Sequence, residues 1–244
     1  MIPVSRLVLG TAVFGLPWYG YGSTSRPTVA DSLAIVRHAS RRGIQVFDTA
    51  QGYGDAGALL YTAGIPPSQI ITKARLGVIC HAHDFRAMLI HNPLIEDLSR
   101  VPLGCGVSVY TSDEVTEAQR LGIAPIQAPA SCLNRPVCVD YARAPFLQGV
   151  LLRSPGRAPD ALREVVALFQ QIARDANLSA VTLALHAAAD RGGHVVFGVS
   201  SVWQLDAVLE AAAESPSRHA VDRAQALHPL VDANAALPSL WSVR

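Results

Sequence analysis

The stretch of residues 44–54 constrains the fold most, because it reads as a buried strand that ends in a polar turn. Its first four residues are mostly apolar, Asp48 stands where the strand meets solvent, and Tyr53 follows on a loop between two glycines. Two later apolar runs end in the same way, one on Lys73 and one on His91. Successive strands that each place a polar side chain at their C-terminal end are typical of the active-site end of a β/α barrel.

Strand-like and helix-like segments alternate along the chain, which predicts a parallel sheet with right-handed crossovers. We expect strands at residues 7–9, 44–47, 70–73, 87–91, 103–109, 124–128 and 194–199. Apolar periodicity and capping residues predict helices at 28–42, 56–63, 112–121, 159–177, 179–190 and 201–214, with Ser112 as a cap and Gly192-Gly193 as a stop. Residues 129–158 hold four prolines and no clear helix, and residues 215–244 indicate a helical surface tail.

The size and composition of the chain fit one domain over residues 1–244. Half of the residues are hydrophobic and 16% are charged, which suits a large buried core. The formal net charge of +1 comes without a basic stripe, so we expect no nucleic-acid partner. No apolar run approaches the ~18 residues of a membrane span, and the first residues do not resemble a secretion signal, so we expect a cytoplasmic protein with no membrane partner.

The four cysteines form no C-x-x-C pair, and we expect them to be reduced and mostly structural. One cluster, Cys80-His81-Ala82-His83, brings residue types that ligate metals close together. Because no partner cluster occurs elsewhere, the sequence predicts no metal site.

Short motifs that occur in the same order in one protein family are spread over residues 7–210. They are Leu9-Gly10-Thr11-Ala12 with Phe14-Gly15, Phe47-Asp48-Thr49-Ala50 with Tyr53-Gly54, Thr72-Lys73, His91-Asn92-Pro93, Gly106-Val107-Ser108-Val109-Tyr110, Ile126-Gln127, Phe146-Leu147-Gln148-Gly149 and Phe197-Gly198-Val199-Ser200. In this order they resemble the aldo-keto reductases. The resemblance implies an α/β fold, a (β/α)8 TIM-type barrel.

The resemblance also implies a catalytic set of four residues, Asp48, Tyr53, Lys73 and His91, at the matching motif positions. Tyr53 would protonate the alkoxide that forms when a carbonyl is reduced, although an unperturbed phenol has a pKa near ~10. The ammonium of Lys73 would favour phenolate character, Asp48 would hold that ammonium, and His91 would orient the carbonyl. The implied function is the reduction of a small-molecule aldehyde or ketone to an alcohol.

A nicotinamide cofactor would supply the hydride in such an enzyme. Ser108 and Gln127 match the family positions that bind the nicotinamide carboxamide. The loop after the last strand opens a helix suited to a phosphate, and its matching residues are Gly198, Val199, Ser200, Ser201 and Gln204. The residues present leave the choice between NADPH and NADH open, together with a barrel that binds neither.

The spacing of the expected strands indicates a trimmed outer layer. Lys73 and His91 are 18 positions apart, and His91 and Ser108 are 17 positions apart. A parallel crossover needs at least ~10–12 residues, so some outer helices should be shortened or missing. Apolar strand faces left uncovered would need a neighbour, which leads to the hypothesis of a homodimer.

Two other functions stay open. The same barrel with the acid–base set Tyr53, Lys73 and His91 would serve an isomerase, a cyclase or a dehydratase that uses no nicotinamide, with secondary metabolism as one setting. A non-catalytic binding or regulatory subunit is the third hypothesis, and the retention of all four residues argues against it.

Overall fold

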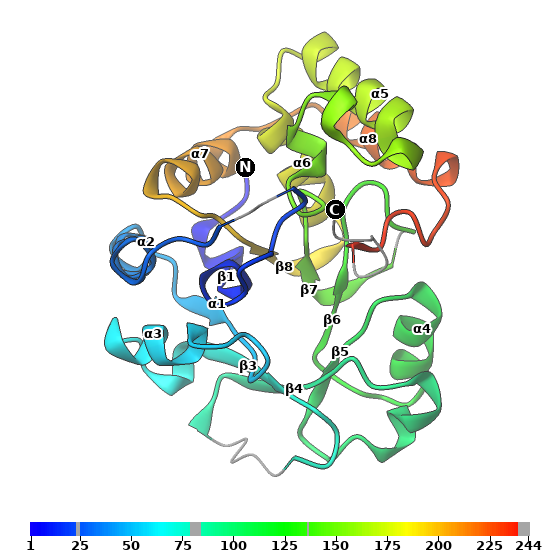
Figure 1. The fold of residues 1–244 in the computed structure, drawn as a ribbon. Coiled ribbons are helices and arrows are strands. Elements are labelled where there is room, and N and C mark those ends of the chain that lie inside the picture. The colour runs from blue at the N-terminus through cyan, green and yellow to red at the C-terminus, as the bar shows by residue number, and fades with distance from the viewer. Residues whose placement is uncertain (23–24, 79–83, 136, 239–244) are drawn as a thin grey trace.

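The computed structural model describes residues 1–22, 25–78, 84–135 and 137–238 of the chain (Figure 1). Within these ranges eight parallel strands pair in sequence order, and the last pairs with the first to close a barrel. They are β1 (Leu7–Gly10), β2 (Val46–Asp48), β3 (Ile70–Ala74), β4 (Ala87–His91), β5 (Gly106–Ser108), β6 (Ile126–Pro129), β7 (Val139–Arg143) and β8 (Gly192–Phe197). The predicted (β/α)8 barrel is confirmed, whereas β7 lies in the proline-rich stretch for which the sequence predicts no strand.

The pleat of the strands decides which side chains enter the barrel. The middle of the barrel is filled by a small apolar cluster of Val8, Val46, Ile71, Leu89, Tyr141 and Val196. Because side chains alternate between the two faces of a strand, the residues two positions further along point into the barrel as well. Asp48, Lys73, His91 and Arg143 stand at these positions, so four polar side chains enter the C-terminal end of the barrel above the apolar layer.

Helices pack around the barrel in the order expected for alternating strands and helices (Figure 1). The described α-helices are α1 (Ala12–Gly15), α2 (Val29–Arg41), α3 (Ala56–Thr62), α4 (Ser112–Arg120), α5 (Arg163–Asp175), α6 (Ala180–Ala189), α7 (Val202–Ala213) and α8 (Arg218–Gln225). Short 3-10 helices are η1 (Val4–Arg6), η2 (Pro67–Gln69), η4 (Ile95–Arg100), η5 (Val150–Leu152), η6 (Pro155–Arg157), η7 (Asp160–Leu162) and η8 (His228–Leu230). In the described ranges no helix has both the length and the apolar character that a membrane span requires.

The helix ends confirm some capping predictions and correct two. Ser179 and Ser201 cap α6 and α7 through their side chains, at the starts of the predicted helices 179–190 and 201–214. α4 is capped by Thr111 in a reciprocal capping box with Glu114, so Ser112 is its first residue rather than its cap. The Gly192-Gly193 pair does not stop a helix but opens β8. A Cβ at Gly192 would lie 2.7 Å from the Cβ of Ala142, which explains the need for glycine where β7 and β8 approach closely.

The outer layer is thin on the side of β3 to β7, as the short spacings predict. No α-helix is described between β3 and β4, a 3-10 helix separates β4 from β5, and nine positions separate β6 from β7. The outer faces of these strands are nevertheless buried within the chain. Leu98 of η4 and Val115 of α4 pack on Ile90, Val107 and further residues of a second apolar cluster. The homodimer therefore remains a prediction, without the bare strand faces that motivated it.

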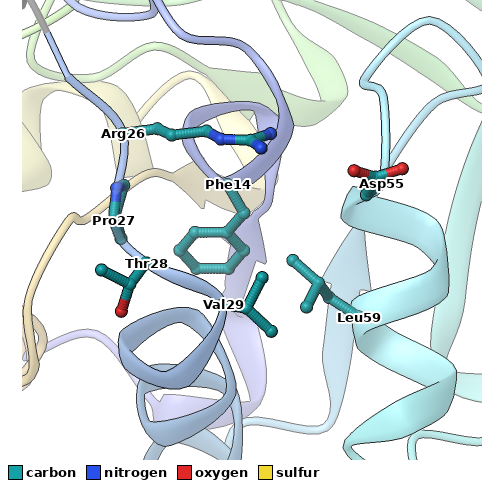
Figure 2. Close-up of a pocket in the computed structure, with 7 residues that line it drawn as sticks. All are labelled: Phe14, Arg26, Pro27, Thr28, Val29, Asp55 and Leu59. Atoms are coloured by element: carbon teal, nitrogen blue, oxygen red, sulfur yellow. The ribbon is translucent and has the colours of Figure 1, made fainter.

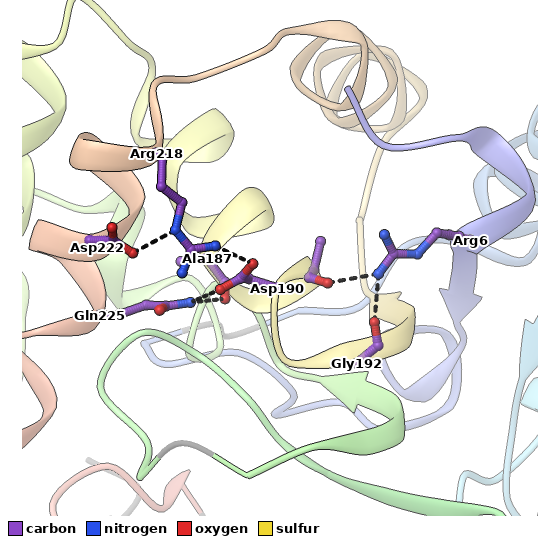
Figure 3. A network of polar contacts seen from close by, with 8 residues as sticks. Arg6, Ala187, Asp190, Gly192, Arg218, Asp222 and Gln225 are labelled. Atoms are coloured by element: carbon purple, nitrogen blue, oxygen red, sulfur yellow. Dashed lines mark hydrogen bonds and ion pairs between the residues drawn. The ribbon is translucent and has the colours of Figure 1, made fainter.

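The N-terminal end of the barrel is closed by a polar network (Figure 3). Arg6, just before β1, donates hydrogen bonds to the carbonyl oxygens of Ala189 and Gly192 at 2.7 and 2.5 Å. Arg218 of α8 binds Asp190 and Asp222 at 2.6 and 2.8 Å. These contacts tie the C-terminal helix and the start of β1 to the turn between α6 and β8. Because Arg6 and Arg218 use their donors on groups of the chain itself, we assign this end of the barrel a structural role.

Candidate active site

Four side chains that the sequence places far apart meet at the C-terminal end of the barrel. Asp48 ends β2, Lys73 lies in β3, His91 ends β4, and Tyr53 stands on the loop after β2. The carboxylate oxygen Oδ1 of Asp48 lies 2.5 Å from Nζ of Lys73, which also donates to the Thr49 carbonyl at 3.0 Å. The same ammonium lies 5.1 Å from the centroid of the Tyr53 ring. The ring centroids of Tyr53 and His91 are 5.9 Å apart with an interplanar angle of 86°.

The position of Tyr53 is fixed by close packing of its loop on α1. A Cβ at Gly15 would lie 1.7 Å from the carbonyl oxygen of Tyr53, so only glycine allows this approach. Gly54 has a φ of 52°, which suits the turn that follows. Gly15 and Gly54, both part of the sequence motifs, therefore hold the Tyr53 phenol at the mouth of the barrel.

The four groups form two layers of different accessibility. Asp48 and Lys73 are 4% and 1% exposed, so the ion pair is sealed inside the barrel. Tyr53 and His91 are half-buried, so their edges can meet a bound molecule. The arrangement thus places a buried positive charge and its counterion beneath two side chains whose chemistry allows proton transfer or hydrogen bonding.

Burial sets the protonation of the phenol and the amine. The pKa of Tyr53 is raised above its ordinary value by burial and by the Asp48 carboxylate, while Arg143 opposes the rise. The pKa of Lys73 is lowered by burial, and the charge and hydrogen bond of Asp48 oppose that change. The phenol is therefore protonated at neutral pH and has a proton to donate.

The imidazole of His91 is neutral at physiological pH. Its pKa is lowered from 6.5 to about 4, first by burial and then by the positive charges of Lys73 and Arg143, with Arg75 also lowering it. A neutral imidazole has one N–H donor and one acceptor nitrogen. His91 can therefore donate a single hydrogen bond to a carbonyl oxygen without carrying a charge.

We expect this lowered pKa to be visible in solution. In a proton NMR titration of the chain, the His91 imidazole should titrate near pH 4. The unfolded chain binds the proton at about 6.5, so it holds more protons than the folded chain between these two values. The free energy of unfolding should therefore rise with pH across this window, and more steeply than in His91→Gln. His219→Gln, at an exposed position on α8, is the control and should follow the native curve. Equal slopes for all three proteins would contradict the assignment.

Ser108 and Gln127, the residues matched to the nicotinamide carboxamide, are engaged with the chain itself. Nε2 of Gln127 donates to Oδ2 of Asp48 at 2.7 Å, and Ser108 donates its hydroxyl to Oε1 of Gln127 at 3.2 Å. Their exposed fractions are 0% for Gln127 and 1% for Ser108. In this arrangement they do not fit a carboxamide-binding role. Gln127 holds the second oxygen of Asp48 and Ser108 holds Gln127, so that both oxygens of this carboxylate have partners.

The loop between β8 and α7, unlike the Ser108 and Gln127 pair, fits the role that the resemblance implies, which is to bind a phosphate. Gly198 and Ser200 are exposed at the N-terminus of a 12-residue helix, where backbone N–H groups favour an anion. Oε1 of Gln204 accepts hydrogen bonds from the backbone N–H and the hydroxyl of Ser200, at 2.7 and 3.0 Å. An incoming phosphate would replace this amide oxygen. Val199, also matched to the cofactor, packs its side chain into the main core.

One charged residue of the site was not singled out by the sequence. Arg143 ends β7 and is half-buried, with its guanidinium 4.3 Å from the centroid of the Tyr110 ring. Its Nη2 donates to the carbonyl oxygen of Val109 at 2.9 Å. The one local signal is weak: three of the five residues in the run 139–143 are apolar, and the run ends on a charged residue. The neighbouring phenol of Tyr19 is also within electrostatic reach, and burial raises its pKa.

Comparison with known proteins agrees with the barrel fold. No protein-family model and no curated protein sequence matches the chain. Among solved structures, aldo-keto reductase AKR11C1 from Bacillus halodurans, in its holo form, superimposes with a TM-score of 0.68 over 93% of this chain and 92% of that one, at 17% identity. The glycerol dehydrogenase AKR11B4 from Gluconobacter oxydans gives a TM-score of 0.62 over 92% and 90% of the two chains, at 16% identity. This chain has the fold of the aldo-keto reductases.

In this aldo-keto reductase fold, the four groups lie at the end of the barrel where β/α barrels hold their active sites. Two hollows lie elsewhere. A cavity of about 190 Å³ lies between α1 and the starts of α2 and α3, where Arg26 extends over the ring of Phe14 toward Asp55 (Figure 2). Another of about 220 Å³ borders the loop 49–54 from the outside of the barrel. Neither is lined by Tyr53 or His91, so we do not place the reaction in them.

The described residues contain no group of His, Cys, Asp and Glu side chains that would hold a metal ion. The cluster Cys80-His81-Ala82-His83 lies outside the described residues. The expectation that the chain binds no metal therefore stays a prediction.

Proposed function

We propose that the chain is an oxidoreductase of the aldo-keto reductase type that reduces an aldehyde or a ketone to an alcohol. The observation that supports this most is the buried Asp48–Lys73 pair directly beneath the half-buried Tyr53 and His91. Carbonyl reduction places negative charge on one oxygen, and this oxygen needs a proton, a hydrogen bond and a nearby positive charge. The four side chains supply all three from one end of the barrel.

Each residue has a separate role in the proposed reaction. Tyr53 donates its phenolic proton to the carbonyl oxygen as negative charge develops there. Neutral His91 donates one N–H to the same oxygen and orients the carbonyl. Lys73 supplies positive charge beneath the phenol, and Asp48 together with Gln127 holds that ammonium in place. Because these groups are fixed before a substrate arrives, little reorganisation is needed during the reaction.

A nicotinamide cofactor, when bound, supplies the hydride for this chemistry. Gly198, Ser200 and Ser201 would hold its phosphate at the start of α7. Ser108 and Gln127 would first have to leave their partners to meet a carboxamide. We propose NADPH or NADH as the cofactor on the strength of the phosphate loop and the fold.

A second candidate function is favoured by the engagement of Gln127. With Gln127 bonded to Asp48 and Ser108 bonded to Gln127, the barrel retains an acid–base set, but the Gln127 amide does not stand free for a nicotinamide. Such a site would suit an isomerase, a cyclase or a dehydratase, in which Tyr53 and His91 move protons and no hydride is transferred.

Titration with the reduced cofactors separates the two candidates. For the oxidoreductase we expect NADPH or NADH to bind at micromolar to millimolar concentration, measured by calorimetry and by the fluorescence of the nicotinamide. Addition of an aldehyde and ketone panel should then oxidise the bound cofactor, followed by its absorbance. A chain that binds neither cofactor at millimolar concentration would rule out the oxidoreductase. It would leave the acid–base enzyme as the function to test.

A further inference from the structure

We propose that Arg143 binds an anionic group of the substrate, so that the enzyme acts on carbonyl compounds that carry a carboxylate or a phosphate. This inference rests on the proposed function for the carbonyl, and on the surroundings of Arg143 for the anion. The mouth of the barrel would then have two parts. Tyr53 and His91 would meet the reacting carbonyl, and Arg143 would meet the charged end of the same molecule.

The placement of Arg143 supports a role toward a ligand. It points into the barrel from β7, two positions after Tyr141 of the apolar layer. Its neighbours in the sheet are β6 and β8, so it lies across the barrel from the strands that carry Asp48 and Lys73. It is half-buried and therefore reachable. Its positive charge acts to lower the pKa of Tyr53, Lys73 and His91, so these three side chains are within its electrostatic reach.

Most N–H donors of Arg143 make no hydrogen bond to the described part of the chain. A guanidinium has five N–H donors, and among the described residues this one makes a single hydrogen bond, from Nη2 to the Val109 carbonyl. No described carboxylate forms an ion pair with it. The nearby Glu114 is engaged by the backbone N–H groups of Tyr110 and Thr111, at 2.8 and 2.7 Å. The positive charge of Arg143 is therefore not neutralised by the described part of the chain.

The guanidinium is also held ready for a planar anion. The Tyr110 ring lies beneath it and the Val109 carbonyl fixes one of its edges, so less side-chain freedom is lost when a ligand binds. The free edge suits the two oxygens of a carboxylate or a phosphate, which arginine binds with two parallel hydrogen bonds. The Asp48 carboxylate is occupied by Lys73 and Gln127 and does not compete.

Binding of simple anions to the full chain tests the proposal without any turnover. Calorimetric titration with benzoate, phenyl phosphate and uncharged benzamide should give binding of at least one anion and weak or no binding of benzamide. Arg143→Leu should weaken binding of the anion about ten- to a hundred-fold. Arg143→Lys, which keeps the charge but loses the fork, should lie between. Arg120→Leu, at an exposed ion pair on α4, is the control and should bind as the native chain does.

Several outcomes would overturn the proposal. Native protein that binds neither anion, or that binds benzamide as tightly as benzoate, would remove the anion site. The same holds if Arg143→Leu is folded, as judged by circular dichroism, and binds the anion with native affinity. If Arg143→Leu does not fold, Arg143→Gln keeps a donor for Val109 without the charge and replaces it. The tighter of benzoate and phenyl phosphate identifies the anionic group.

Turnover separates this proposal from the proposed function. With succinic semialdehyde and butanal as a charged and an uncharged aldehyde, Arg143→Leu should raise KM for the first at least ten-fold and leave KM for the second nearly unchanged. If no aldehyde is reduced while anion binding still depends on Arg143, carbonyl reduction fails and the anion site stands. If both aldehydes are reduced equally well by the native protein, the anion proposal fails and the reductase stands.

Discussion

Replacing Tyr53 by phenylalanine should lower kcat/KM for carbonyl reduction by about two to four orders of magnitude and leave the fold intact. The phenolic oxygen is the only atom removed. The described residues give this oxygen no protein hydrogen-bond partner, and the ring keeps its contact with Lys73 and with the main core. The loss should therefore be chemical rather than structural. Initial rates with saturating cofactor measure the first effect, and thermal unfolding of the same sample measures the second.

Tyr61→Phe is the matched control for this prediction. Tyr61 lies on α3 with 52% of its surface exposed, and it is separate from the barrel mouth. Its loss of a hydroxyl should change neither rate nor stability. If the chain proves to be an acid–base enzyme without nicotinamide, Tyr53→Phe should abolish that turnover instead. Full activity of Tyr53→Phe in both assays would exclude the phenol as the proton donor of either reaction.

The end of the barrel at which the site lies could be predicted from sequence because of a repeated local pattern. Asp48, Lys73 and His91 each close a short apolar run, and parallel strands with right-handed crossovers bring such ends together. Two-residue alternation then fixes the direction of each side chain, because an inward apolar residue lies two positions before each of them. The barrel and the convergence of these three side chains therefore follow from periodicity and from order along the chain.

The sequence does not show which hydrogen-bond partner each buried polar side chain has. Gln127 bonds to Asp48, 79 positions away, rather than standing free for a ligand. A hydrogen bond to Asp48 and a hydrogen bond to a ligand would each satisfy the buried Gln127 amide. Which of the two forms depends on how the strands are placed in space, and no local sequence pattern reveals it. Resemblance assigns Gln127 a role that holds only if this hydrogen bond is given up.

β7 escaped prediction for a different reason. It is five residues long, contains Asp140 and Arg143, and lies between prolines 136 and 145, so its local composition favours a loop. Pairing with β6 and β8 on both sides overrides that local preference. Because the strand was missed, its terminal arginine was missed as well, and with it the positive charge on which the substrate proposal rests.

The second large effect should follow from breaking the buried ion pair. We expect Asp48→Asn to lower the free energy of unfolding by about 3–5 kcal/mol, since it leaves the Lys73 ammonium buried without a counterion. An asparagine also has one acceptor oxygen where Asp48 accepts from both Lys73 and Gln127. Urea denaturation measures the change. Asp97→Asn, which breaks the exposed pair with Arg100 on η4, is the control and should cost about 0–1 kcal/mol.

The double variant Asp48→Asn with Lys73→Met decides whether charge is the cause. Removing the amine together with the acid leaves no unpaired buried charge, so the double variant should be more stable than the sum of the single changes predicts. The pH dependence gives a second test. Burial already lowers the pKa of Lys73, and loss of Asp48 should lower it further, whereas the unfolded chain keeps a lysine pKa near ~10.4.

Between these two pKa values the unfolded state of Asp48→Asn binds more protons than the folded state, so its stability should rise with pH across that window. The native chain, whose ammonium keeps its counterion, should show a smaller rise. The contrary outcome is that Asp48→Asn is destabilised equally at all pH values and that its effect simply adds to that of Lys73→Met. That outcome would contradict the buried charge as the cause, and would mean that the side chains stabilise this end of the barrel through packing.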